Sequence, residues 1–134
     1  MIQRIQTAYL LVAGLLTASL FKFRFAEITV NSETLPVNGL PVTIFIGITV
    51  LLHFIIIGMY KKRIRQIRAT VFTIVLLLGL SGLFLYFAYA CINGAEVAFK
   101  IPVVFPLVAI IFDFLAIRAI RKDEALVRSL NRIR

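Results

Sequence analysis

Residues 40–60, with the sequence LPVTIFIGITVLLHFIIIGMY, contain one histidine and no lysine, arginine, aspartate or glutamate. An α-helix rises about 1.5 Å per residue and the hydrocarbon core of a bilayer is about 30 Å thick, so about 20 apolar residues cross it. This 21-residue segment therefore has the length and the polarity of a transmembrane helix.

Three further segments are apolar in the same way. They are residues 5–21, 69–91 and 101–117, of 17, 23 and 17 residues. The two shorter segments can each extend by a turn, because Lys22 and Lys100 can direct their ammonium groups outward. The sequence predicts four transmembrane helices in one integral membrane domain covering residues 1–134, at about residues 5–22, 40–60, 69–91 and 101–119.

The overall composition agrees with this prediction. Hydrophobic residues make up 61% of the 134 residues, and the mean hydropathy is +1.01, whereas a soluble domain is about half apolar. In a helix the backbone N–H and C=O groups bond one another, and this is needed because lipid offers them no hydrogen-bond partners. Because the connections are short, neighbouring helices should run antiparallel, and we expect an all-α membrane protein built as an up-down-up-down four-helix bundle.

The net charge of +9 invites a nucleic-acid interpretation, but the positions of the basic residues argue against it. Twelve of the fifteen lie on one side of the predicted membrane: Arg4, five within residues 61–68 and six within residues 118–134. Lys22, Arg24 and Lys100 lie on the other side. By the positive-inside rule, both termini and residues 61–68 should be cytoplasmic. We expect an inner-membrane protein and no nucleic-acid partner.

The two outer connections carry a β pattern. Apolar and polar residues alternate from Phe21 to Val30 with one phase slip, which is typical of a strand with a bulge. Residues 31–33 and 38–39 have turn composition, and residues 95–100 contain enough Val and Phe for a partner strand. The sequence predicts a small extracytoplasmic β-cap.

The basic tail, residues 118–134, has apolar residues at near-helical spacing. It can lie on an inner leaflet rich in anionic headgroups, or dock onto a cytoplasmic protein partner. Both alternatives apply to the basic residues of this side, so the candidate lipid or partner contacts are Lys61, Lys62, Arg63, Arg65, Arg68, Arg118, Arg121, Lys122, Arg128, Arg132 and Arg134.

Two ionisable residues fall well inside the predicted spans. Asp113 precedes Arg118 by five residues and His53 precedes Lys61 by eight, which at the helical rise is about 7.5 Å and about 12 Å below the cytoplasmic boundary. Ionisable groups within a membrane usually mark a function. A coupled Asp113–His53 proton relay is therefore one hypothesis, and it requires contact across the core.

The alternative is a structural role for Asp113. The first helix neighbours the fourth, so Tyr9 should lie near the depth of Asp113. Tyr9 or Gln6 can then satisfy the carboxylate, with Arg4 reaching toward it. The small residues Gly14 and Ala18 follow the small-x-x-x-small pattern, which serves packing within the bundle or, alternatively, a homodimer face.

Catalytic constellations are missing from the sequence. One histidine cannot form a two-histidine metal site, and no phosphate-binding glycine loop is present. The single cysteine, Cys91, excludes chemistry that needs paired thiols. We expect no catalytic, metal or cofactor site.

Both ends of the chain carry distinctive motifs. The opening MIQRIQT followed by Tyr9-Leu10-Leu11 and the closing AIR, IRKDE, LVRS and NRIR resemble domain-of-unknown-function family 4293. This family comprises small four-helix inner-membrane proteins of Bacteroidota. The resemblance implies a bacterial inner-membrane protein and supplies no catalytic residues.

These observations leave two classes of function. The first is a non-enzymatic accessory or assembly subunit of a larger membrane complex, since few polar groups lie inside and basic segments gather on one face. The second is a small oligomeric transporter or proton-coupled carrier that uses Asp113.

Overall fold

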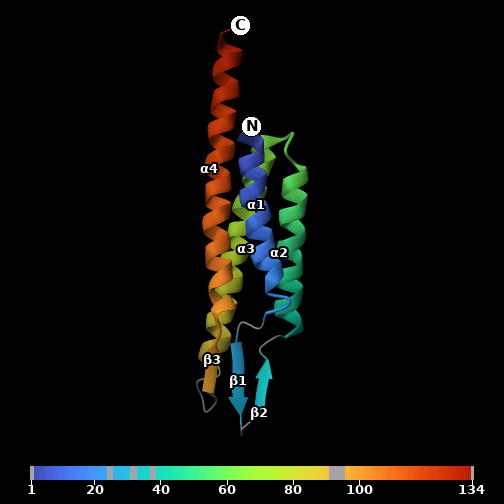
Figure 1. Cartoon of the computed structure of the whole chain (residues 1–134), viewed down its shortest axis with the longest axis vertical. Coiled ribbons are helices and arrows are strands. Elements are labelled where there is room, and N and C mark those ends of the chain that lie inside the picture. The colour runs from blue at the N-terminus through green and yellow to red at the C-terminus, as the bar shows by residue number, and fades with distance from the viewer. Residues whose placement is uncertain (1, 24–25, 31–32, 37–38, 91–95, 134) are drawn as a thin grey trace.

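The four apolar segments form helices in the computed structural model, which describes residues 2–23, 26–30, 33–36, 39–90 and 96–133 (Figure 1). The helices are α1 (Ile2–Ser19), α2 (Leu40–Gly58), α3 (Arg63–Ala90) and α4 (Phe105–Arg132), and a short 3-10 helix, η1 (Ile101–Val104), precedes α4. Leu40–Gly58, Arg63–Phe87 and Ile101–Arg132 are long and apolar enough to cross a membrane, and α1 adds the shorter apolar helix Ile5–Ser19. The prediction of an all-α membrane protein with four helices is confirmed.

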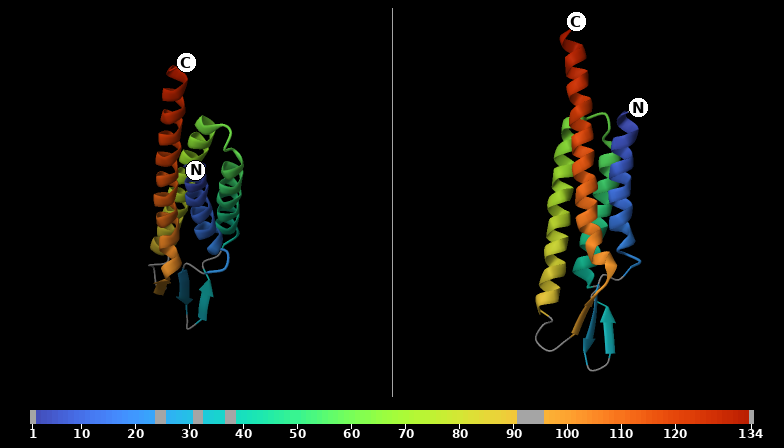
Figure 2. Two further views of the ribbon diagram at one scale, coloured as in Figure 1. Left: turned by 45° about the horizontal axis from the view of Figure 1, so that its top comes forward. Right: turned by 60° about the vertical axis from the view of Figure 1, so that its left-hand side comes forward.

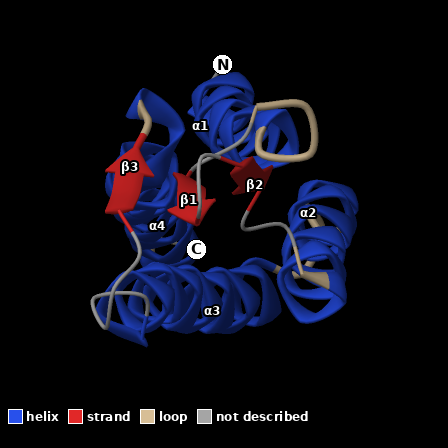
Figure 3. Cartoon of the chain, turned by 90° about the horizontal axis from the view of Figure 1, so that it is seen from below, coloured by secondary structure: helices blue, strands red, loops and turns tan. Residues whose placement is uncertain are grey.

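The helices follow one another around a ring, as the end-on view shows (Figure 3). α1 packs against α2 and α4, and α3 packs against the same two helices, so α2 and α4 are diagonally opposite. The small sheet occupies one end of the bundle, the sheet end. The opposite end, here called the basic end, contains the start of α1, the α2–α3 connection and the end of α4 (Figures 1 and 2).

The sheet contains β1 (Ala26–Val30), β2 (Glu33–Pro36) and β3 (Glu96–Phe99) in the order β2-β1-β3. β1 is antiparallel to both neighbours. Its centre is Ile28, which faces Leu35 of β2 and Val97 of β3 in the register. The prediction that the two outer connections pair as strands is confirmed.

Two details of the predicted β-cap are wrong. Phe21 and Phe23 are not in a strand, because their N–H groups donate to carbonyl oxygens of α1 and continue its last turn. Glu33 begins β2 instead of completing a turn. β2 has little apolar alternation, and its proline is tolerated because β2 is an edge strand. Residues 24–25, 31–32, 38, 95 and Cys91 lie outside the described residues.

Proline defines the starts of α2 and α4. Pro41 lies in the first turn of α2, where a missing N–H group leaves no hydrogen bond unmade. Pro102 lies in η1, and Pro106 lies in the first turn of α4. Pro106 cannot donate to the carbonyl of Pro102, and that oxygen accepts the N–H of Phe105 instead. The 3-10 turn thus replaces the hydrogen bond that the proline removes.

The bundle has an apolar surface, and several polar residues lie in its core beside apolar ones. Large apolar side chains such as Leu51, Leu78 and Phe114 point outward and are more than half exposed. Eight polar or charged residues are buried among the described ones: Gln6, Thr17, Thr49, His53, Gln66, Thr70, Thr73 and Asp113. An apolar exterior is stable when the surrounding solvent is lipid, and the buried polar groups then bond with partners inside the bundle.

Candidate functional site

The buried residues His53 and Asp113 meet in the middle of the bundle. His53 comes from α2 and Asp113 from α4, and each is 0% exposed. The imidazole Nε2 lies 3.2 Å from Asp113 Oδ1 and 3.3 Å from Oδ2. Since α2 and α4 are diagonal in the ring, this contact crosses the core.

Thr73 adds a third helix to the pair. Its Oγ1 lies 3.0 Å from Asp113 Oδ2 and 2.7 Å from the carbonyl oxygen of Thr70 on the preceding turn of α3. One hydroxyl has one proton and can donate it to one of these acceptors at a time. The Thr73 hydroxyl can therefore donate either to the Asp113 carboxylate or to the carbonyl oxygen of Thr70.

The hydrogen bonds of His53 fix its protons. Nδ1 lies 2.8 Å from the carbonyl oxygen of Thr49, and a carbonyl can only accept, so Nδ1 carries a proton. Nε2 then shares a second proton with Asp113, either as an imidazolium facing a carboxylate or as a neutral imidazole facing a carboxylic acid. In both states the pair is neutral as a whole, which limits the free energy of burying it in lipid.

α1 closes the site through a glycine. A Cβ added at Gly14 would lie 3.2 Å from His53 Cβ and 3.6 Å from its Cγ. The 3.2 Å contact is tight enough that His53 would have to shift by a few tenths of an ångström. Gly14 of the small-x-x-x-small pattern therefore allows α1 to approach His53 within the bundle.

Gln6 and Tyr9, which the sequence offered as partners of Asp113, contact other residues of α4 instead. Gln6 Nε2 donates to the carbonyl oxygen of Ala119 at 3.3 Å, and the Tyr9 ring lies 6.2 Å from that of Phe112, centroid to centroid. Both residues connect α1 to α4, whereas Asp113 is bonded by His53 and Thr73. The side chain of Arg4 lies outside the described part of the chain.

A line of polar residues on α3 leads from this cluster toward the basic end. Gln66, Thr70 and Thr73 lie on one buried face at helical spacing. Thr70 donates to the carbonyl of Gln66 at 2.9 Å. Gln66 is 2% exposed, and its amide donates to Ile56 while its Oε1 has no hydrogen-bond partner among the described residues. Toward the sheet end the core is apolar, with Leu20, Val42, Ile46, Leu80 and Phe84.

Sequence reasoning missed the threonines of the cluster. The available signal was their spacing, because Thr70 and Thr73 recur after Gln66 within an otherwise apolar segment. Threonine is common in membrane helices, where its hydroxyl bonds the preceding turn. Only the contact with Asp113 distinguishes Thr73 from such a residue.

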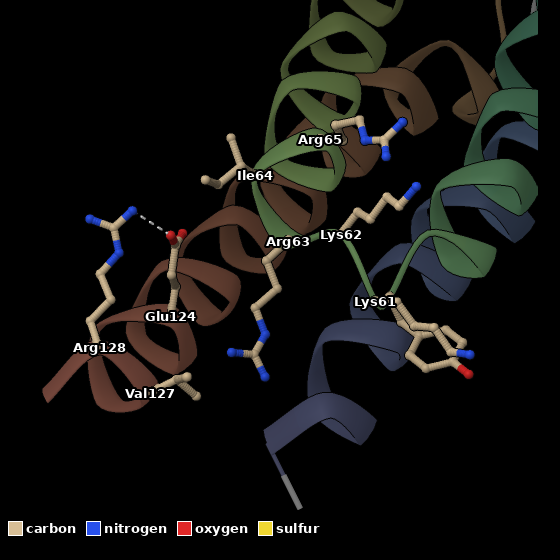
Figure 4. A pocket seen from close by; sticks show the side chains of 9 residues that line it. Lys61, Lys62, Arg63, Ile64, Arg65, Glu124, Val127 and Arg128 are labelled. Atoms are coloured by element: carbon tan, nitrogen blue, oxygen red, sulfur yellow. Dashed lines mark hydrogen bonds and ion pairs between the residues drawn. The ribbon is translucent and has the colours of Figure 1, made fainter. Parts of the chain in front are cut away.

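The basic residues of the α2–α3 connection form a second candidate site with the base of the α4 tail (Figure 4). They surround an open groove of about 500 Å³. We call it the basic groove, and it is lined by Tyr60, Lys61, Lys62, Arg63, Ile64, Arg65, Glu124, Val127 and Arg128. Arg63 Nη2 forms an ion pair with Asp123 Oδ2 at 3.1 Å, and Arg128 bonds Glu124 at 2.8 Å.

The other basic residues lie on the same end but outside this groove. Arg68 is exposed on α3, and Arg118, Arg121, Lys122 and Arg132 are exposed on α4. Arg134 lies outside the described residues. Among the residues that the structure describes, no group of three His, Cys, Asp or Glu side chains is arranged to hold a metal ion.

The fold and the buried cluster define a small helical integral membrane protein whose polar interior is bonded across the bundle. The chain belongs to the family of the domain of unknown function DUF4293, whose model matches residues 2–133. No curated protein and no solved structure matches the chain.

Proposed function

We propose that this protein is a non-enzymatic accessory or assembly subunit of a complex in a bacterial inner membrane, with both termini in the cytoplasm. The proposed orientation rests on the sequence, which has twelve basic residues on one side of the apolar spans and three on the other. The sheet then lies outside the cytoplasm. The proposed role rests on the α4 tail.

The tail is a continuous extension of α4. The helix runs unbroken from Phe105 to Arg132 and continues along the bundle axis past the start of α1 (Figures 1 and 2). No glycine or proline follows Pro106, so nothing in the sequence favours a bend that would lay the tail on the leaflet. A protein partner in the cytoplasm therefore fits the distal tail better than lipid does.

One side of the tail continues the seam through which α4 packs on α1. Phe112 and Ala119 contact α1 in the bundle, and beyond them Leu126, Leu130 and Ile133 follow at alternating spacings of four and three residues. These three side chains are 46%, 66% and 83% exposed. A seam with this spacing is suited to a second helix.

The charges of the tail favour a different protein over a second copy of this chain. After Glu124 the sequence contains Arg128, Arg132 and Arg134 and no acidic residue, so two tails would repel each other. An acidic amphipathic helix of a cytoplasmic or membrane subunit complements both the apolar seam and the positive charge of the tail. The exposed seam of the tail is the single observation that carries this proposal.

Site-specific photo-crosslinking in native membranes tests the proposal. A benzoylphenylalanine at Leu130 lies on the seam, and the same group at Arg128 lies on the opposite side of the helix, about 3 Å away along its axis. We expect Leu130 to crosslink to one protein that also co-purifies in mild detergent at constant stoichiometry, and Arg128 to crosslink far less. Isolation of the protein alone or as a homo-oligomer, or equal crosslinking from both positions, would overturn the proposal.

A second candidate function is a proton-coupled carrier. It is favoured by the buried contact between His53 Nε2 and Asp113 Oδ1, two groups that can exchange a proton. Flux measurements in liposomes test it with Asp113→Asn, which should abolish transport and leave the fold intact. Unchanged flux, or no flux with the wild-type protein, would exclude Asp113 as a carrier group.

A further inference from the structure

The basic groove has an excess of positive charge that the protein itself does not neutralise. Of its five cations, Arg63 and Arg128 pair with Asp123 and Glu124. In the described part of the chain, no carboxylate pairs with Lys61, Lys62 or Arg65. Besides the buried Asp113, the basic end has no further acidic residue in the sequence.

The three remaining cations belong to one short stretch of chain. Lys61 and Lys62 lie in the connection after α2, and Arg65 lies in the first turn of α3, which contains no acidic residue. Figure 4 shows the side chains of Lys62 and Arg65 extending in the same direction from this stretch. A phosphodiester carries one negative charge and two free oxygens, so two neighbouring cations of this kind can both contact it.

The groove also has an apolar part. Tyr60 and Ile64 line it and are each half exposed, and they stand where the apolar spans of α2 and α3 end. A tyrosine at the end of a span is typical of the level of the headgroups. An amphipathic ligand can therefore place an anionic headgroup among the cations of the groove. Its apolar part can then lie along the exposed apolar faces of the helices.

We propose that the basic groove binds the headgroup of an anionic glycerophospholipid. The lipid phosphate contacts Lys62 and Arg65, with Lys61 close by, and the acyl chains run along the outer faces of α2 and α3. Soluble phosphate has the same anionic chemistry, but it makes no use of Tyr60 and Ile64. This site is independent of the protein partner proposed for the distal tail.

Fluorescence quenching by brominated phospholipids measures the site directly, because the chain contains no tryptophan. Tyr60→Trp places a reporter in the groove. Phe54→Trp places a control reporter on the exposed face of α2, within the span. We expect brominated phosphatidylglycerol to bind more tightly than brominated phosphatidylcholine at the groove reporter, and both lipids to bind equally at the control reporter.

Variants that lack two of the cations test whether Lys62 and Arg65 cause the preference for the anionic lipid. In the groove reporter, Lys62→Gln with Arg65→Gln should reduce the preference for phosphatidylglycerol by about fivefold for each cation removed. The matched control, Arg118→Gln with Lys122→Gln, removes the same charge from exposed positions of α4 outside the groove and should leave the preference nearly unchanged.

Three results would overturn the proposal. Equal affinities for the two lipids at the groove reporter would show that no anionic lipid is selected. An equal loss in both double variants would show a general surface charge effect without a site. Displacement of the lipid by millimolar inorganic phosphate, but not by chloride at the same ionic strength, would show that the groove takes free phosphate. Circular dichroism of each variant confirms that the helices are intact.

Discussion

Substitutions of Asp113 test whether the buried cluster is held by hydrogen bonds or by charge. In Asp113→Asn, the amide N–H can donate to His53 Nε2, and the amide oxygen can accept the proton of Thr73. All partners stay bonded, and the neutral imidazole keeps its Nδ1 proton on the carbonyl of Thr49. The expected loss in the free energy of unfolding is below about 1 kcal/mol, because no buried donor or acceptor is left without a partner.

Asp113→Ala removes the same carboxylate and leaves one buried polar group without a hydrogen-bond partner. Thr73 can turn to the carbonyl of Thr70, which lies 2.7 Å away, so only His53 Nε2 remains buried without a partner. An orphaned buried polar group costs about 1–3 kcal/mol, and hydrogen bonds within membranes contribute about 0.6 and at most about 1.7 kcal/mol. We therefore expect alanine to destabilise the bundle by about 1–2 kcal/mol.

Reversible unfolding in mixed micelles, by titration of sodium dodecyl sulfate and detection by circular dichroism, measures both losses. Glu124→Gln on the same helix is the control, since its surface ion pair with Arg128 contributes less than about 0.5 kcal/mol. Equal losses for asparagine and alanine at Asp113 would refute the hydrogen-bond argument in favour of charge. No loss for alanine would show that the cluster does not stabilise the bundle.

Two further predictions concern packing and orientation. Gly14→Ala should destabilise the bundle by about 1–3 kcal/mol, because the new methyl group pushes against the buried histidine. The control Gly82→Ala, where a Cβ meets nothing within 4 Å, should be neutral or slightly stabilising in the same titration. In a Cys91→Ser background, an impermeant maleimide should label Thr29→Cys in intact spheroplasts and Ser129→Cys only after lysis; the reverse labelling would contradict the proposed orientation.

Hydropathy and charge predicted the helical part of the fold because both depend on composition over whole segments. A span such as residues 40–60 needs only length and low polarity. The same reasoning could not separate the end of α1 from a strand, since Phe21 and Phe23 alternate with Lys22 in either structure. The structure shows a helical turn, because the N–H groups of Phe21 and Phe23 donate to carbonyl oxygens of the preceding turn, those of Ala18 and Ser19.

The candidate site was predictable in its depth but not in its partners. Counting residues to the nearest basic boundary brings Asp113 and His53 to the same half of the bilayer, and the ring order of four helices leaves a contact across the core possible. Which group bonds the carboxylate depends on rotation of each helix about its own axis. A segment that is apolar on all sides does not specify that rotation, so Thr73 could not be chosen over Gln6 or Tyr9.

The cluster supplies the rotational information that the apolar residues lack. In lipid, apolar surfaces between helices gain little from association, so small side chains such as Ala109 and Ala116 allow α4 to approach its neighbours without fixing its height. A bond between Asp113 and His53 restrains the height and the rotation of two helices that are diagonally opposite in the bundle. Thr73 extends this restraint to α3, and Gly14 extends it to α1 through close contact. The buried cluster therefore restrains the register of all four helices, together with the bonds from Gln6 to Ala119 and from Gln66 to Ile56.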